Sequence, residues 1–175
     1  MKVFRWLSVP ALLVGALLFA VPSAHADPIL VYQAFLNGAS ENPPNGTTGS
    51  GYGTVTLNDA MTSFDVDLTW TGLTGNAAAG HIHGPAPVGV NAPVIFPFAI
   101  VPGTSGHFTG TFAINATQLG WLQGGLLYMN LHTAQFPGGE IRGQLTATPE
   151  PTSLILLSTG LFGVARYTRR RLRQS

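Results

Sequence analysis

The sequence of 175 residues predicts an all-β fold, an antiparallel sandwich or Greek-key barrel of about seven or eight strands with one short helix. Segments such as Ser63–Trp70 alternate strictly between apolar and polar residues, as strands with one buried and one solvated side do. Turn-forming pairs such as Asn37-Gly38 and Gly84-Pro85 separate these segments. An apolar stretch at each end of the chain sets off a β domain at residues 27–148.

Four segments carry the alternation most clearly. In Ser63–Trp70, the side chains of Phe64, Val66, Leu68 and Trp70 share one apolar face. The others are His107–Ile114, Leu126–Thr133 and Glu140–Ala147, with Phe108, Phe112, Ile114, Leu127, Met129, Leu131, Ile141 and Leu145 expected inward and Tyr128, Asn130, His132, Glu140, Arg142 and Gln144 outward. Weaker patterns predict strands near Ile29–Leu36, Gly51–Leu57, Gly80–His83 and Val94–Ile100.

The helical pattern lies at Ala116–Gln123. Asn115 precedes it and is expected to be the N-cap, because its side-chain oxygen can accept a hydrogen bond from the first turn. Leu119 and Leu122 would let the helix cover one end of the barrel.

Residues 1–26 predict a secretory signal peptide. Lys2 and Arg5 give a positive start, an apolar run follows, and Ala24-His25-Ala26 forms a small-residue cleavage site. We therefore expect a signal peptidase to cut before Asp27 and the domain to be exported.

The C-terminal end, residues 149–175, has three parts. Pro149-Glu150-Pro151 interrupts regular structure, Leu154–Ala165 is largely apolar, and the terminal arginines include Arg169, Arg170 and Arg171. An apolar stretch followed by arginines is a stop-transfer pattern. The apolar stretch is shorter than the ~20 residues that a stable transmembrane span needs. We therefore expect residues 152–168 to anchor the chain in the inner membrane only transiently.

These three parts resemble the PEP-CTERM sorting signal of Gram-negative bacteria. The resemblance implies processing by an exosortase-type membrane peptidase and release to the cell surface or outside. An ordinary C-terminal transmembrane helix is the alternative, and both place the β domain beyond the cytoplasm.

The charge of the β domain excludes two classes of partner. Arg142 is its one Lys or Arg, against the acidic residues Asp27, Glu41, Asp59, Asp65, Asp67 and Glu140. Nucleic acids and anionic membrane surfaces are bound by clustered basic residues, so the domain is expected to bind neither. The chain has no cysteine, which excludes disulfides and thiolate metal ligands.

Four phrases resemble the CHRD domain over about residues 29–147. They are LNGASENPP (36–44), GHIHGPA (80–86), LLYMNLHT (126–133) and PGGEIRGQL (137–145). The resemblance implies a β-sandwich-like module with an interaction role and no agreed biochemical activity for bacterial members. Asn42 departs from the family, which more often has an apolar residue between the acid and the proline.

His81 and His83 stand two residues apart in a predicted strand and so point the same way. His132 and Glu140 are expected on the outward side of the two following strands. Two imidazoles from one strand, a third imidazole from another strand and a nearby carboxylate would together suit copper or zinc as a ligand set. The interpretation we favour is instead a hydrogen-bond network that fixes the Gly84–Pro93 connection, and direct contact with a partner is a third alternative.

Glu140 and Arg142 share a face, so they are expected to form an ion pair, and Arg142 can also bind a loop carbonyl. Asp65 and Asp67 are expected on a solvated strand face without the spacing of a calcium loop. Tyr52, Tyr128 and Trp70 are weaker candidates for a sugar platform, although Trp70 also fits the core.

The sequence shows no catalytic constellation, so we expect no catalytic residues and no cofactor. The first hypothesis is an exported, non-catalytic binding or structural module at the cell surface or in the extracellular matrix, with a polysaccharide or a surface protein as partner. The alternative is a copper- or zinc-binding protein that uses the His-x-His pair and is redox-active or a metal carrier.

Overall fold

The computed structural model describes residues 31–148, 160–161 and 166. The predicted signal peptide, residues 1–26, and the sorting residues Pro149, Glu150, Pro151, Arg169, Arg170 and Arg171 lie outside the described residues. In the described part of the chain, no helix is both long and apolar enough to cross a membrane.

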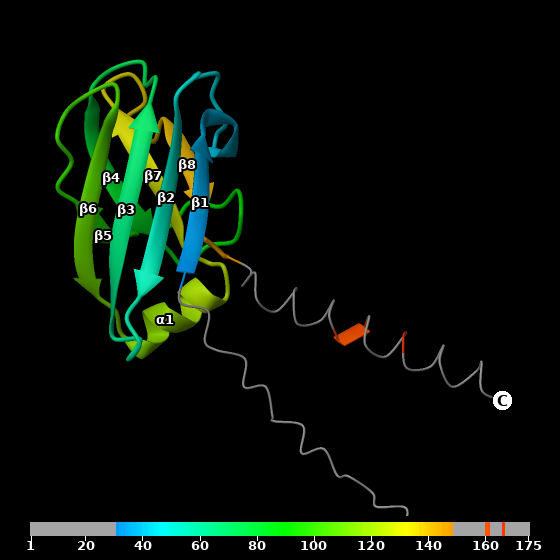
Figure 1. Cartoon of the computed structure of the whole chain (residues 1–175). Coiled ribbons are helices and arrows are strands. Elements are labelled where there is room, and N and C mark those ends of the chain that lie inside the picture. The colour runs from blue at the N-terminus through cyan, green and yellow to red at the C-terminus, as the bar shows by residue number, and fades with distance from the viewer. Residues whose placement is uncertain (1–30, 149–159, 162–165, 167–175) are drawn as a thin grey trace, which may run out of the picture.

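The predicted all-β fold is confirmed: the strands form one antiparallel, nearly closed barrel-like sheet (Figure 1). The strand order is β5-β4-β7-β8-β1-β2-β3-β6, and a short β9 pairs with β1. The strands are β1 (Val31–Asn37), β2 (Ser50–Leu57), β3 (Ser63–Thr71), β4 (Ala77–His83), β5 (Val94–Phe98), β6 (Gly106–Ala113), β7 (Tyr128–Thr133), β8 (Ile141–Gln144) and β9 (Thr146–Ala147).

Alternation in β3 builds the core as predicted. Its even-numbered side chains from Phe64 to Trp70 are buried, and the odd-numbered ones between them are exposed. The edge strands β5 and β6 approach through aromatic rings: Phe98 stacks on Phe108 with centroids 4.7 Å apart, and Phe96 lies 5.6 Å from Phe112. These rings close the side of the barrel at which no strand pairing is present.

Helix α1 (Ala116–Gln123) has the predicted bounds. The Asn115 side chain accepts a hydrogen bond from Gln118 N–H, and Gln118 reciprocates at Asn115 N–H, so the N-terminus is closed by a capping box. Leu122 is buried and Leu119 packs against the core, which places the helix over one end of the barrel (Figure 1).

Most strand ends shift by about one or two residues from the predicted bounds, and three differences are larger. The last predicted strand is divided at Leu145, whose N–H binds Leu127 O while the chain moves on to pair with β1. Strand β4 begins at Ala77, earlier than predicted. The sequence did not indicate this start, because a run of alanines shows no alternation between apolar and polar residues. A 3-10 helix, η1 (Gly38–Ser40), follows β1, where only a turn was predicted.

The predicted solvated face of β7 and β8 is buried, which corrects the sequence interpretation. Tyr128 and Asn130 are each 3% exposed, Arg142 is 1% exposed and Glu140 is 0% exposed. The segments 84–93 and 41–47 bind over this face, for example through the bond from Gln144 Nε2 to Ala86 O. Polar side chains can be buried here because these segments supply their hydrogen-bond partners.

Candidate metal centre

Three histidines converge on the covered face of the sheet. His81 and His83 project from β4, while Ile82 between them is 0% exposed in the core. His132 comes from the adjacent strand β7. One ring nitrogen from each histidine lies within 4.8 Å of the others, and the shortest approach, His81 Nδ1 to His132 Nε2, is 3.1 Å.

Backbone carbonyls fix the tautomers of two of these rings. His83 donates from Nδ1 to Ala92 O at 2.8 Å, and His132 donates from Nδ1 to Pro137 O at 3.0 Å. A neutral imidazole carries one N–H, so Nε2 of each ring retains a lone pair. Metal-binding histidines are typically held in this way by their second nitrogen.

The buried Nε2 atom of His83 has no hydrogen-bond partner among the described residues. The amide of Asn130 lies near this ring but does not meet it in hydrogen-bond geometry; its Oδ1 atom lies 3.1 Å from Nε2 of His132. A buried acceptor without a donor costs free energy. A metal ion satisfies such a lone pair, so the donor set fits a metal.

The spacing also suits a metal after a small adjustment. Nitrogen ligands ~2.1 Å from a tetrahedral metal are roughly 3.4 Å apart. The His81–His132 pair is already within this spacing, and the ligand nitrogens of all three rings lie within 4.8 Å of one another.

The environment keeps all three imidazoles neutral at neutral pH. Burial, together with the His132 and His83 rings, lowers the pKa of His81 to about 4. Burial lowers the pKa of His83, against the hydrogen bond to Ala92, and the charge of Arg142 lowers it too. Burial likewise lowers the pKa of His132. Only neutral imidazole offers a lone pair to a metal.

Glu140 does not join the three histidines. Its carboxylate accepts hydrogen bonds from the hydroxyls of Thr47 and Thr133, each at 2.6 Å, and from the N–H and hydroxyl of Thr74 at 2.7 and 2.9 Å. These bonds outweigh burial and lower the pKa of Glu140. Glu140 therefore ties three segments of the chain together.

Arg142 binds the loop, as predicted, but it forms no ion pair with Glu140. Its Nη2 atom donates to Val90 O at 2.8 Å and its Nη1 atom to Asn91 Oδ1 at 3.1 Å. On the surface, His107 Nε2 and Asp67 Oδ1 lie 3.0 Å apart in a hydrogen bond. The sequence pattern places Glu140 and Arg142 on one face, but each binds a different covering segment: Glu140 binds segment 41–47, and Arg142 binds segment 84–93.

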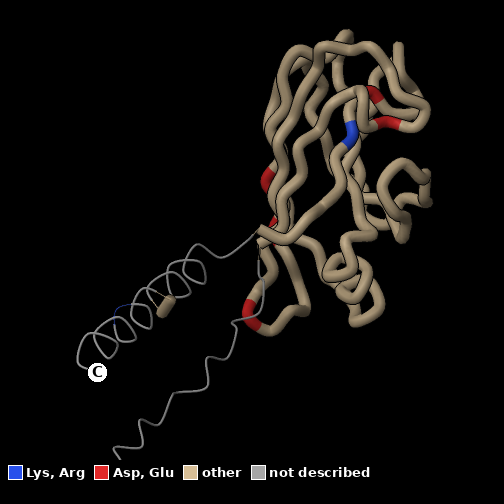
Figure 2. Tube along the Cα trace, turned by 90° about the vertical axis from the view of Figure 1, so that its right-hand side faces the viewer, with Lys and Arg blue, Asp and Glu red and all other residues tan. Residues whose placement is uncertain are grey.

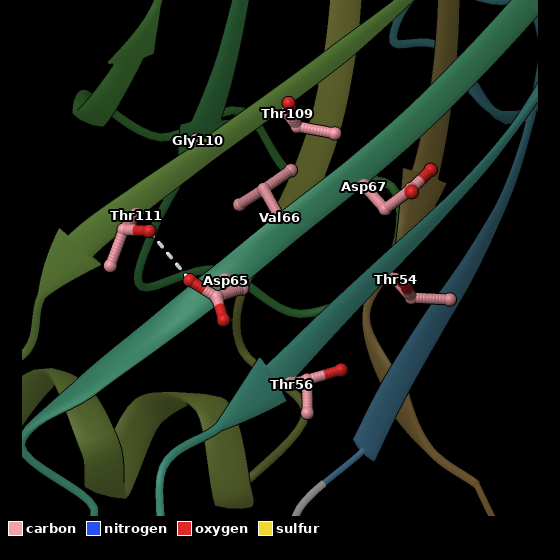
Figure 3. Close-up of a pocket in the computed structure, with 8 residues that line it drawn as sticks. All are labelled: Thr54, Thr56, Asp65, Val66, Asp67, Thr109, Gly110 and Thr111. Carbon is pink, nitrogen blue, oxygen red and sulfur yellow. Dashed lines mark hydrogen bonds between the residues drawn. The ribbon is translucent and has the colours of Figure 1, made fainter.

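The β domain has one basic position in residues 31–148, Arg142, among five acidic ones (Figure 2). Asp65 and Asp67 lie on the exposed face of β3, as predicted, between threonines of β2 and β6 (Figure 3). Thr111 donates to Asp65 at 2.6 Å. Of the three sugar-platform candidates, Tyr128 and Trp70 are buried, and Tyr52 remains exposed beside Phe35.

Sequence reasoning missed how Tyr128 and Ala92 support the centre. The Tyr128 ring stacks on His83 with centroids 4.9 Å apart and planes 3° apart, and its hydroxyl accepts a hydrogen bond from Ala92 N–H at 3.1 Å. The shared face of Tyr128, Asn130 and His132 in the sequence could have indicated one cluster, but no sequence signal points to Ala92.

Comparisons with known proteins agree with this architecture. The CHRD domain model matches residues 32–145, and the PEP-CTERM protein-sorting motif matches residues 147–171. Comparison with curated proteins found no match, and neither did comparison with solved structures. The sorting motif implies processing by an exosortase and an exported, extracellular protein. The chain therefore belongs to the CHRD domain family and ends in a PEP-CTERM sorting motif.

Proposed function

We propose that this exported chain is a non-catalytic binding module of the cell surface or extracellular matrix, and that its ligand is a copper or zinc ion held by His81, His83 and His132. The observation that carries the proposal is the convergence of three neutral imidazoles around the buried, unpartnered Nε2 atom of His83.

The chemistry of the donors selects the class of metal. Imidazole nitrogen suits copper and zinc, whereas calcium and magnesium prefer oxygen ligands. The oxygen donor predicted for this site, Glu140, is occupied by threonine hydroxyls. Three nitrogen ligands would leave one position of a tetrahedral ion for water or for a partner's side chain.

A binding role without catalysis is supported by the surroundings of the centre. Hydrolysis at a metal needs a group beside the open position that can take up or give a proton. Glu140 is fully engaged elsewhere, the charge of Arg142 is permanent, and Glu41 does not group with the three histidines.

Metal analysis of the purified chain tests the proposal. We expect about one copper or zinc ion per chain after incubation with the metal and removal of excess, and loss of this ion when His81, His83 and His132 are replaced together by alanine. His107→Ala is the matched control, because His107 lies outside the cluster. Metal-free protein whose melting temperature does not change with excess copper or zinc would overturn the proposal, because a ligand of the folded state must raise stability.

A second ligand class, polysaccharide, is supported by the outer face of β1, β2, β3 and β6. Phe35 and Tyr52 are 66% and 40% exposed, and their ring centroids are 5.0 Å apart. Adjacent threonines and aspartates offer hydrogen-bonding groups on the same sheet (Figure 3). Exposed aromatic faces beside such groups suit sugar rings, which have an apolar face and many hydroxyls.

Binding to neutral polysaccharides in a pull-down assay tests this second ligand. The double variant F35A/Y52A should lose binding, and H83A should retain it, since His83 lies outside this aromatic pair. Equal binding by F35A/Y52A and the unaltered chain would exclude this face as the site.

A further inference from the structure

Arg142 is a buried cation whose charge is not neutralised by an ion pair. It is 1% exposed, and in the described part of the chain no carboxylate oxygen lies within salt-bridge distance of it. Burying an unpaired charge is costly. Its observed partners are neutral: Val90 O, Asn91 Oδ1 and the ring of Tyr128, whose centroid lies 3.4 Å from the guanidinium carbon.

These partners connect Arg142 to the metal centre by two short routes. The first is aromatic, because Tyr128 contacts Arg142 from β8 and stacks on His83 from β4, the strands on either side of β7. The second runs along the loop. Arg142 holds Val90 and Asn91, and the next residue, Ala92, accepts the hydrogen bond from His83 Nδ1.

Tyr128 also joins the aromatic route to the loop route. Its hydroxyl accepts from Ala92 N–H at 3.1 Å, so the residue that fixes the His83 tautomer is itself fixed. Arg142, Tyr128 and Ala92 therefore determine both the plane of the His83 ring and the direction of its free lone pair.

We propose, on the basis of the metal site proposed above, that Arg142 is a positioning residue for His83 and that its buried charge shifts a bound copper ion toward Cu(I). The couple is Cu(II) + e⁻ ⇌ Cu(I), and the reduced ion carries one positive charge less. A fixed cation nearby therefore repels the oxidised form more than the reduced form.

Coulomb's law gives the order of magnitude of this effect. One unit charge at ~10 Å, with an effective dielectric constant of about 20, changes the ratio of Cu(I) to Cu(II) affinity by about tenfold. Glu41 is the carboxylate whose charge acts on Arg142. Because burial raises the pKa of Glu41 to about 7, its charge is incomplete at neutral pH.

The test is a redox titration of the copper-loaded full chain and its variants at pH 8, with Cu(I) and Cu(II) affinities measured alongside. Arg142→Met should lower the ratio of Cu(I) to Cu(II) affinity about tenfold, which is ~59 mV for a one-electron couple. Arg142→Lys should stay close to the unaltered chain, because the charge is retained. Glu41→Gln should move the ratio in the opposite direction, because it removes a negative charge beside Arg142.

The variants also separate structural from electrostatic effects. If Arg142→Met does not fold, Glu41→Gln decides the question, since it keeps every hydrogen bond that Arg142 makes. Unchanged potentials in folded Arg142→Met, or in Glu41→Gln when Arg142→Met fails to fold, would overturn the inference. Copper uptake by the unaltered chain would leave the proposed function standing in that case, whereas no copper uptake at all would refute both.

Discussion

His81 and His132 face each other nitrogen to nitrogen, with His81 Nδ1 3.1 Å from His132 Nε2. Since His132 donates its Nδ1 proton to Pro137 O, its neutral ring accepts at Nε2 from His81, and the Asn130 amide beside it is then oriented with its NH2 group toward Nε2. Metal-free His81 therefore carries its proton on Nδ1. A metal that takes both nitrogens must displace that proton to Nε2 of His81.

We predict that zinc changes the tautomer of His81 from Nδ1–H to Nε2–H, because both facing nitrogens become ligands. Ring nitrogen chemical shifts of the ¹⁵N-labelled chain, recorded before and after one equivalent of zinc, measure this change. His107, outside the cluster, should keep its spectrum. Zinc bound with the His81 tautomer unchanged would contradict ligation through Nδ1.

The stability of the metal-free protein should fall in acid through His81. Its pKa is lowered from 6.5 to about 4 in the folded state, so folding favours the neutral ring. This contribution is complete above pH 6.5 and is lost as the pH falls through 4. After discounting for partial exposure it is about 1–3 kcal/mol. Urea denaturation between pH 7 and about 4 should show a shallower decline for His81→Gln than for the unaltered chain.

Glu41 should act in the opposite sense. Its pKa is raised to about 7 by burial, so folding favours the protonated form. The stability it contributes is complete below pH 4.5, its unfolded value, and is lost as the pH rises through 7. Glu41→Gln should therefore raise the free energy of unfolding at pH 8 by about 1–3 kcal/mol and much less at pH 5. An equal gain at both pH values would show that ionisation is not the cause.

Glu140→Gln should lower the free energy of unfolding by about 2–4 kcal/mol, because it weakens four hydrogen bonds to a buried charge. Asp59→Asn, at an exposed turn, should change it by less than about 0.5 kcal/mol. Metal uptake by folded Glu140→Gln should equal that of the unaltered chain. A lost metal ion would show that Glu140 is a ligand after all.

The sequence could predict elements whose own residues specify them. Alternation predicted β3, and the helical pattern after the N-cap candidate Asn115 predicted α1 with its observed bounds. The burial of Glu140 and Arg142 could not be predicted, because it depends on loops that are distant in sequence: Thr47 and Thr74 for one, Val90 and Asn91 for the other.

The candidate site, too, could be predicted only in part from the sequence. Period-two spacing placed His81 and His83 on one face, and the strand pattern put His132 on the outward side. Strand pairing order then decided that β4 lies beside β7, which no local pattern specifies. Strand register suggested that Glu140 would lie beside His132. Its carboxylate instead accepts hydrogen bonds from threonine hydroxyls, which hold it away from the histidines.

Strand β9 has two residues, and it joins β1 through the pairs Tyr32–Ala147 and Gln33–Thr146, with one more bond from Thr148 N–H to Val31 O. Any pull through the C-terminal segment would reach these bonds first and load them one after another. Strand β9 would separate from β1 while the longer ladders of β1, β2 and β3 stayed intact. Mechanical strain on an attached chain would thus be absorbed at the last few residues of the β domain, outside the strands that carry the three clustered histidines.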